Sequence, residues 1–439
     1  MKQTVLLLAL TIISVNSIAQ MWQRTYGVPG HAEIAVCTVN SYDNGFIINF
    51  NGDGANVLKA DINGNILWLK KYLYYENNYI GPFSISSSHE GIIFQGGVIF
   101  EGNLFYAYIV KTNNCGEFVW CKKNIFNSEN LLKFIKIKSD DQIIFVTAAS
   151  SLNIMLDRFQ LWEMNSDGNI NWTKQVLPGT QTYFSGTEFQ QMCFTSDGGS
   201  LLAGYTYYPY DTTNNPWDGI LQPCLVKHDS LGNRQWVYPP ISGADTNHIG
   251  FFNACVQVGN TYYAAGSNYN YGPGHFLQPL VARFDLNGNL LSYVSSGPDT
   301  MYHELTQILP ATDTSILLIS AANNAFGDPN YLMVFIANTL GNFNKGFIRH
   351  DLIVGQYGDE VCIMRDNKFI IPCSFPIGGI SANTDIVAIK LNANLEYDSI
   401  YTQQFTYDSL CPYPIVSDTV ICNCEPFVSA EEAESVTEA

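Results

Sequence analysis

One polar turn recurs seven times along this chain, and that repetition limits the fold more than any other feature of the sequence. The first copy reads KADINGNILW at residues 59–68, and related segments begin at residues 111, 163, 227, 283, 336 and 390. The centre of the turn recurs at intervals of 52, 52, 64, 56, 53 and 54 residues. The residues at that position are Gly64, Gly116, Gly168, Gly232, Gly288, Gly341 and Leu395. A period of this length indicates repeated copies of one small structural unit.

A second series of polar turns precedes the first, also in seven copies, among them DNGFII at 43–48 and DDQIIF at 140–145. Both series place Asn, Asp and Gly between short runs rich in Ile, Val, Phe and Tyr, as tight β-hairpins require. Two hairpins give four strands per repeat, predicted in the first copy at 34–40, 45–50, 57–61 and 66–72. A repeat of this length with four strands is typical of a propeller blade. We therefore predict an all-β, seven-bladed β-propeller of four-stranded antiparallel blades. A β-solenoid would have a shorter repeat without the paired hairpins.

The two ends of the repeat region suggest how the ring closes and where it stops. Residues 22–26 resemble the fourth strand of a repeat but precede the first one. We expect this surplus strand to pair with the last blade, which would cover an exposed sheet edge. The pattern ends near residue 406, so we assign 20–406 to the propeller and 407–439 to a Cys-containing acidic linker or tail.

The first twenty residues have the features of a secretory signal. Lys2 is followed by an apolar run at 5–15 and by the small-residue segment Ser17–Ala19. We assign 1–19 to a signal peptide, with the mature chain beginning at Gln20. No later apolar stretch is long enough for a transmembrane span. We therefore expect an exported protein, extracellular or on the outer cell surface, with the periplasm as the alternative.

The charge balance excludes some partners. The chain has a net charge of -18, and only 14% of its residues are charged. Nucleic-acid binding needs clustered Lys and Arg, so we expect no nucleic-acid partner. A chain with 46% hydrophobic residues will also fold rather than stay disordered.

Nine of the eleven cysteines fall into two groups. Those in the first strand of their blades are expected to be buried thiols between blades, because four separate blades cannot all pair equivalent residues. These are Cys37, Cys193, Cys255 and Cys362. The expected disulfide formers, with their pairing left open, flank one hairpin or lie in the tail. These are Cys115, Cys121, Cys411, Cys422 and Cys424.

The recurrent aromatic and acidic residues of the turn are interpreted as structural. A fixed place in every repeat favours packing between blades over a carbohydrate platform for Trp68, Trp120, Trp172 and Trp236. Asp61, Asp229 and Asp285 lack the ligand spacing of a calcium loop, so we expect them to cap their own turns. No metal site is predicted.

The K-x-D-x-x-G-N-x-x-W turn, followed by a polar turn and a GFII-like strand, resembles secreted propeller-repeat proteins of Bacteroidota. The resemblance covers residues 21–406. Many such proteins are exported by the type IX secretion system, so it implies secretion machinery as a partner and a C-terminal sorting domain, which would begin where this chain stops. The turn is also similar to the Trp motif of quinone-dependent dehydrogenase and WD-like propellers. That motif is structural there, so no cofactor is implied.

No catalytic motif stands out in the sequence. HExxH, GxSxG, the phosphate-binding GxxxxGK[ST] and GxGxxG are all absent, and the seven His are scattered singly. We assign no catalytic residue, and we expect a binding protein rather than an enzyme.

The loops carry the candidate binding site. Connections between the second and third strands of a blade, and between blades, share one face of a propeller, and here they are long and rich in Tyr, above all at 205–222 and 268–279. Binding residues concentrate on such loops, although the same aromatics could simply pack against one another. The candidate ligand-binding residues are Tyr207, Tyr208, Tyr210, Trp217, Tyr271, His275, Tyr302 and His303.

These features favour a non-catalytic exported propeller that binds a protein or glycan through its long-loop face. One alternative is a propeller enzyme, glycoside-active or quinone-dependent, which predicts convergent carboxylates or a cofactor at the central funnel of that face. Another is a structural spacer that carries a C-terminal sorting domain. Fold alone does not decide among them.

Overall fold

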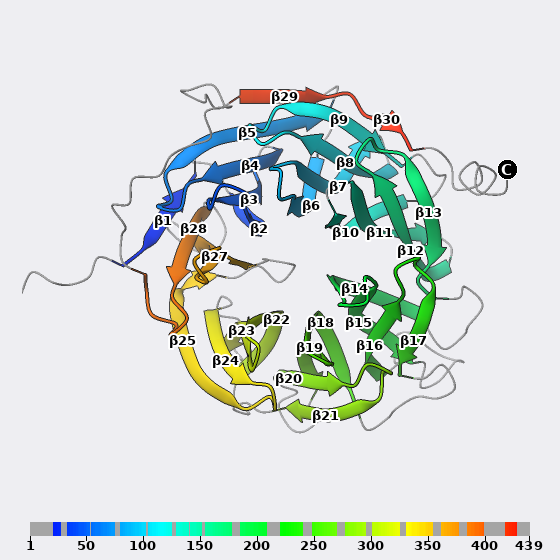
Figure 1. The fold of residues 1–439 in the computed structure, drawn as a ribbon, viewed down its shortest axis with the longest axis vertical. Coiled ribbons are helices and arrows are strands. Elements are labelled where there is room, and N and C mark those ends of the chain that lie inside the picture. Colours follow the sequence, from blue (N-terminus) through cyan, green and yellow to red (C-terminus); the bar gives the residue numbers. More distant parts are fainter. Residues whose placement is uncertain are drawn as a thin grey trace, which may run out of the picture.

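The computed structural model describes most of the chain and shows a seven-bladed β-propeller with no helix among the described residues (Figure 1). The described residues are 21–27, 33–52, 54–74, 80–101, 104–124, 129–139, 141–151, 154–177, 185–208, 220–239, 248–269, 277–295, 301–324, 331–353, 361–376, 384–398 and 418–427. The signal-peptide assignment, 1–19, lies outside them. The predicted fold class is confirmed.

Each blade is an antiparallel sheet, and in blades 1 to 6 the strands run in chain order from the centre to the rim. Blade 1 comprises β2 (Ile34–Asn40), β3 (Phe46–Asn51), β4 (Ala55–Ala60) and β5 (Ile66–Tyr74). Blade 2 comprises β6 (Ile80–Ser87), β7 (Ile93–Glu101), β8 (Leu104–Thr112) and β9 (Phe118–Lys123). Blade 3 comprises β10 (Glu129–Ser139), β11 (Gln142–Ser151), β12 (Ile154–Asn165) and β13 (Ile170–Gln175). Blade 4 comprises β14 (Ser185–Phe194), β15 (Ser200–Tyr208), β16 (Ile220–His228) and β17 (Arg234–Tyr238).

The remaining blades complete the ring. Blade 5 comprises β18 (Gly250–Val258), β19 (Thr261–Tyr269), β20 (Leu277–Phe284) and β21 (Leu290–Ser295). Blade 6 comprises β22 (Met301–Thr312), β23 (Ser315–Asn324), β24 (Tyr331–Asn338) and β25 (Phe343–Ile353). Blade 7 comprises β26 (Cys362–Ile363), β27 (Phe369–Pro376), β28 (Thr384–Leu391) and the N-terminal β1 (Gln23–Tyr26). A single pair, Ile353↔Ser374, joins β25 of blade 6 to β27 of blade 7.

The N-terminal strand closes the ring, as predicted from its likeness to a fourth strand. β1 pairs antiparallel with β28, with Gln23 opposite Ile389. Its aromatic residue Tyr26 donates a hydrogen bond to the Gly64 carbonyl of blade 1 at 3.0 Å. Tyr72 of blade 1 makes the same bond, at 2.9 Å, to the Gly116 carbonyl of blade 2. The interface between blades 7 and 1 therefore has the same tyrosine–carbonyl hydrogen bond as the interface between blades 1 and 2.

The recurrent turn has one geometry in every blade. Asp61 accepts the backbone N–H groups of Asn63 and Asn65 on one carboxylate oxygen, at 2.9 and 2.7 Å. The predicted turn-capping role is thus confirmed, and it extends to the equivalent residues Asn113, Asn165, Asp229, Asp285, Asn338 and Asn392. Residues at the turn centre have positive φ, from 56° at Leu395 to 87° at Gly168, where glycine is favoured.

The recurrent tryptophans join neighbouring blades, as predicted. The Trp68 indole N–H donates to the Asn114 carbonyl of the next blade at 3.3 Å, and Trp120 and Trp236 make the equivalent bonds. The glycine of the next turn lies against each ring, so close that a Cβ on Gly116 would stand 3.0 Å from Trp68. Glycine is therefore needed both for the backbone conformation and for this contact.

Seven apolar clusters fill the seven interfaces between neighbouring blades. The cluster between blades 7 and 1 contains Trp22 and Phe46, whose ring centroids are 6.2 Å apart. Both faces of each sheet are therefore buried, which accounts for the apolar composition.

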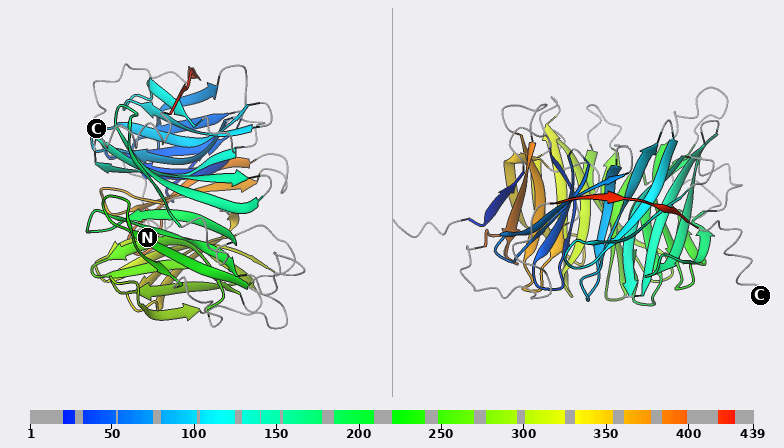
Figure 2. Two further views of the ribbon diagram at one scale, coloured as in Figure 1. Left: turned by 90° about the vertical axis from the view of Figure 1, so that its right-hand side faces the viewer. Right: turned by 90° about the horizontal axis from the view of Figure 1, so that it is seen from above.

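The C-terminal tail is partly built into the outer wall. β29 (Asp418–Cys422) adds parallel to β5, and β30 (Glu425–Pro426) adds parallel to β9. Figure 2 shows this segment in red, crossing the rim of the first two blades. Phe427 then packs near Phe145 and Trp162 of blade 3. We expected a linker or tail over 407–439, and residues 418–427 form a docked belt across three blades.

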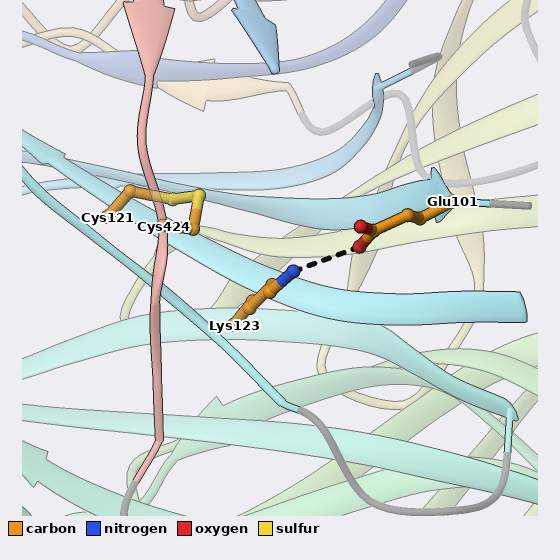
Figure 3. The surroundings of a disulfide bond; sticks show 4 residues. All are labelled: Glu101, Cys121, Lys123 and Cys424. Carbon is orange, nitrogen blue, oxygen red and sulfur yellow. Dashed lines mark hydrogen bonds and ion pairs between the residues drawn. A yellow bond between two sulfur atoms is a disulfide. The ribbon is translucent and has the colours of Figure 1, made fainter. Parts of the chain in front are cut away.

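A disulfide fastens this belt. Cys121 on β9 is bonded to Cys424, beside the ion pair of Lys123 with Glu101 at 2.9 Å (Figure 3). Cys115 is also disulfide-bonded, while Cys422 is a thiol and Cys411 lies outside the described residues. The expectation that hairpin and tail cysteines form disulfides is confirmed for this pair. The first-strand residues Cys37, Cys193, Cys255 and Cys362 are thiols rather than disulfides, as expected.

Candidate functional site

Most of the predicted ligand-binding residues fall where the structure gives no side-chain position. Tyr210, Trp217, Tyr271 and His275 lie outside the described residues. The backbones of Tyr207 and Tyr208 end β15, and Tyr302 is the second residue of β22. All three backbones belong to the face that carries the connections between blades, which we call the loop face. The opposite side, which carries both hairpin turns of each blade, is the hairpin face.

His303 is placed differently from a surface contact residue. Its side chain is only 5% exposed, and neither ring nitrogen has a hydrogen-bond partner among the residues that the structure describes. Burial lowers the pKa of this imidazole, so it is neutral at pH 7. His303 therefore packs beneath the loop face.

A charged cluster lies near the loop-face ends of blades 3 and 4. Lys133 on β10 contacts Glu188 on β14 at 3.1 Å, and the Tyr205 hydroxyl on β15 donates to the same carboxylate. Burial raises the pKa of Glu188, but the Lys133 ammonium and the Tyr205 hydroxyl outweigh it and hold that pKa below its usual value. Glu188 is therefore an anion with fixed orientation.

Aromatic rings continue the cluster into blade 5. The Tyr205 and Phe251 ring centroids are 6.1 Å apart, and those of Phe251 and Tyr269 are 6.0 Å apart, both edge-to-face. Phe251 is buried, whereas the two tyrosines are half-buried. We call Lys133, Glu188, Tyr205, Phe251 and Tyr269 the loop-face cluster. It combines apolar ring surface with a few oriented polar groups, the usual make-up of a ligand site.

A second carboxyl lies on blade 6. Glu304 on β22 accepts a hydrogen bond at 3.0 Å from the Asn253 amide of β18, which also donates to the Leu305 carbonyl at 2.9 Å. Burial raises the pKa of Glu304 above its usual value. Glu188 and Glu304 thus have pKa values shifted in opposite directions at the same end of the inner strands.

A β-bulge sets the position of these side chains. The innermost strands of the first six blades each show a register shift, with the extra residue at Val36, Phe83, Lys133, Gln190, Asn253 and Thr306. Bulges turn a strand locally and re-aim its side chains. Lys133 and Asn253 are themselves bulged residues, so the bulge brings both to their acidic partners.

The residue after the bulge ties one inner strand to the next. Gln191 accepts the Cys255 N–H at 2.9 Å, and Gln307 accepts the Val361 N–H at 2.5 Å. In blade 2 the Ser84 hydroxyl accepts the Ile135 N–H at 3.1 Å. These bonds satisfy backbone groups on the inner edges of the sheets.

A central cavity of about 370 Å³ lies in the half of the ring nearer the hairpin face. It is lined from the inner strands of six blades, and its polar or sulfur-bearing residues include Thr38, Lys136, Gln191, Cys193 and Cys255. Within the described part of the chain, no group of three or more His, Cys, Asp or Glu residues could hold a metal ion.

The sequence interpretation missed Lys133, Glu188 and Glu304. None belongs to a motif, and each acquires its partner only from another strand or blade. The available signal was a carboxylate as the single Asp, Glu, Lys or Arg of a first strand, at Glu188 and Glu304, whereas Lys133 shares its strand with three other charged residues.

Comparison with known proteins supports the fold. No protein-family model matches the sequence, and no curated protein matches it. Among solved structures, the polysaccharide lyase Uly1 is similar with a TM-score of 0.52 and 11% identity, over 86% of this chain and 93% of that one. A protein of unknown function from Bacteroides caccae is similar with a TM-score of 0.43 and 10% identity, over 76% of this chain and 99% of that one. At 11% identity the likeness to Uly1 shows a shared fold alone.

The structure also bears on the membrane question. Across the described ranges, no helix has the length and apolar character needed to cross a membrane.

Proposed function

We propose that this protein is a non-catalytic binding propeller that takes a glycan at its loop face. The observation that carries the proposal is the loop-face cluster. Edge-to-face rings give apolar surface for the C–H faces of a sugar, and the Glu188 carboxylate can accept hydrogen bonds from its hydroxyls. The tyrosines predicted from the sequence, Tyr207 and Tyr208, continue along the same strand toward the same face.

A binding screen on the mature chain tests this proposal. Glu188→Gln keeps the shape of the side chain but removes its charge, so glycan affinity should fall by ~10-fold, the usual effect of losing one charged hydrogen bond. Tyr269→Ala should weaken binding by removing ring surface. Calorimetric titration of a hit from a glycan array measures both effects.

The matched control is Glu117→Gln, which makes the same change at an exposed turn residue on the hairpin face. It should leave affinity unchanged. Equal affinity for all three variants and the parent would remove the loop-face cluster as the site. Binding to a protein instead, with the same loss in Glu188→Gln, would keep the site and change the ligand class.

A second candidate is an enzyme acting on a polysaccharide. It is favoured by the opposite pKa shifts of Glu188 on blade 4 and Glu304 on blade 6, since a general base needs a low pKa and a general acid a raised one. Its fold neighbour Uly1 is a polysaccharide lyase. Incubation with a polysaccharide panel, followed by chromatography of the products, tests it. Shortened products that disappear in Glu304→Gln would establish the enzyme, and intact polysaccharide throughout would exclude it for that panel.

We also propose export through the leader at 1–19, by the type IX machinery that the resemblance implies. The disulfide between Cys121 and Cys424 supports an oxidising destination, because structural disulfides are rare in the cytosol. Fractionation of the native cell tests the proposal, and protein confined to the cytosol with a reduced Cys121 would contradict it.

A further inference from the structure

Two thiols from neighbouring blades meet at the wall of the central cavity. Cys193 on β14 and Cys255 on β18 have their sulfur atoms 3.6 Å apart, although the two residues are 62 positions apart in the sequence. Both line the cavity near the hairpin face. They lie five residues after Glu188 on β14 and four residues after Phe251 on β18, toward the opposite face, so a role for this pair does not depend on the proposed function.

The backbone around this pair is held in place. Gln191, two residues before Cys193, accepts the backbone N–H of Cys255 at 2.9 Å. This hydrogen bond joins the two inner strands and therefore fixes the relative position of the sulfurs. A disulfide bond is about 2.05 Å long, so the sulfurs need to approach by only about 1.5 Å, shared between two side chains.

The two cysteines differ in accessibility. Cys255 is buried and its sulfur also contacts the Leu201 carbonyl at 3.3 Å, whereas Cys193 is half-buried. Burial and the neighbouring Cys193 raise the pKa of the Cys255 thiol well above its usual value, and Lys136 of blade 3, which lines the same cavity, offsets this only in part. An oxidant that enters the cavity would therefore meet Cys193 first.

This arrangement differs from that of another first-strand cysteine. Cys362 has its sulfur against the Met364 sulfur at 3.9 Å, and a thioether cannot form a disulfide. The chain also has a formed disulfide elsewhere, between Cys121 and Cys424, which is typical of proteins that mature where thiols are oxidised.

We propose that Cys193 and Cys255 are a redox-active pair that closes into a disulfide between blades 4 and 5 by reaction with a small-molecule disulfide entering the central cavity. The Cys193 thiolate attacks one sulfur of the small disulfide, whose S–S bond breaks and releases one thiolate. The Cys255 thiolate then attacks the Cys193 sulfur and expels the second thiolate. The two cysteine protons end on the two released thiols, so two protein thiols are oxidised and one disulfide is reduced.

The experiment treats the folded full chain with oxidised glutathione, in the presence of a chelator, and maps disulfides by mass spectrometry after alkylation. We expect a Cys193–Cys255 crosslink, a loss of two thiols per chain, and a rise in Tm of about 5 °C from closing the loop between them. Reduction with dithiothreitol should reverse all three.

Single variants identify the order of attack. Cys255→Ala should accumulate glutathione on Cys193, because the resolving thiol is gone, whereas Cys193→Ala should accumulate little on the buried Cys255. Cys362→Ala is the matched control and should form the crosslink normally. The parent chain gives the decisive result even if a variant does not fold. Two unmodified thiols after prolonged treatment, or a crosslink to a different cysteine, would overturn the proposal.

Discussion

At the scale of single residues, one side-chain oxygen atom of an Asp or Asn stabilises each recurrent turn. The side chain of Asp61 or its equivalent accepts two backbone N–H groups, so the turn forms even where glycine is missing. Leu395 shows this, because it takes φ of 56° at the position where the other six repeats have glycine. The positive φ costs about 1 kcal/mol, and burial of a leucine side chain offsets it by about 2 kcal/mol. Leu395 is 4% exposed and packs between blades 6 and 7, so the substitution is tolerated.

Buried histidines should make stability depend on pH. His228 is fully buried, and burial lowers its pKa from 6.5 to about 4. The unfolded chain therefore binds the proton more readily, so the free energy of unfolding should fall as the pH drops from 6.5 to 4, by about 3 kcal/mol from this residue.

Chemical denaturation at several pH values measures the effect. His228→Gln should flatten the pH dependence in that window, and the difference between variant and parent isolates this residue from the carboxyls. Parallel curves for the two proteins would show that His228 does not titrate as its burial implies.

At the scale of strands, the lysine that begins several of the recurrent turn segments is part of the blade core. Lys59, Lys227 and Lys390 are almost fully buried, and each pairs with an aspartate from the hairpin of its own blade, Asp43, Asp197 and Asp366. Blade 3 inverts the pair, with Glu163 on the third strand and Lys138 at 2.9 Å. In these blades an ion pair thus connects a turn of the first series with a turn of the second.

Removing one partner of such a buried ion pair should lower the free energy of unfolding. Lys59 and Asp43 are 2.7 Å apart with side chains 3% and 9% exposed. Asp43→Asn leaves a buried ammonium without its counterion, so the free energy of unfolding should fall by about 3 kcal/mol. Urea denaturation measures it.

Asp351→Asn is the control, because its partnership with Arg349 is half-exposed and should contribute less than about 1 kcal/mol. A loss at Asp43 no larger than the loss at Asp351 would contradict the prediction.

At the scale of the whole molecule, the ring is closed by a strand from the opposite end of the chain. The N-terminal β1 completes blade 7. Its Tyr26, and Trp22 just before it, pack against blade 1 as Tyr72 and Trp68 pack against blade 2. The C-terminal belt then covers the outer edges of blades 1 and 2 and is fastened by the Cys121–Cys424 disulfide. Both ends of the folded region therefore stabilise the first blade from different sides.

Closure can be tested at Gly64. A Cβ there would stand 2.8 Å from the Trp22 ring and 2.5 Å from Arg24, at φ of 80°. Gly64→Ala should therefore push β1 away from blade 1. The free energy of unfolding should fall by about 2 kcal/mol beyond the loss that backbone strain alone would cause. Hydrogen exchange of residues 23–26 should rise in the same variant.

Gly259→Ala is the matched control. It also has positive φ, 56°, but none of the described atoms lies within 4 Å of its added Cβ. Equal losses of stability at the two positions would mean that the contact with β1 contributes nothing to closure.

The fold was predictable because its information is local and repeated. Each hairpin is encoded by a short polar turn between apolar runs, and seven copies specify the blade number. In the first repeat the strands predicted at 34–40 and 66–72 appear as β2 and β5. The candidate site was less predictable, because Glu188 joins the loop-face cluster only through its ion pair with Lys133 of another blade.

Local patterns in the chain were enough to specify the repeat, its turns, the closing strand and the packing role of the tryptophans between blades, since each was inferred from short segments of sequence. Packing in three dimensions was needed to show which inner-strand side chains meet around the axis. It placed Lys133 beside Glu188 and Cys193 beside Cys255, and it docked the tail onto blades 1 and 2. Those contacts join residues 55, 62 and about 300 positions apart. A local sequence pattern cannot predict them, because the residues meet only when separate parts of the chain pack together.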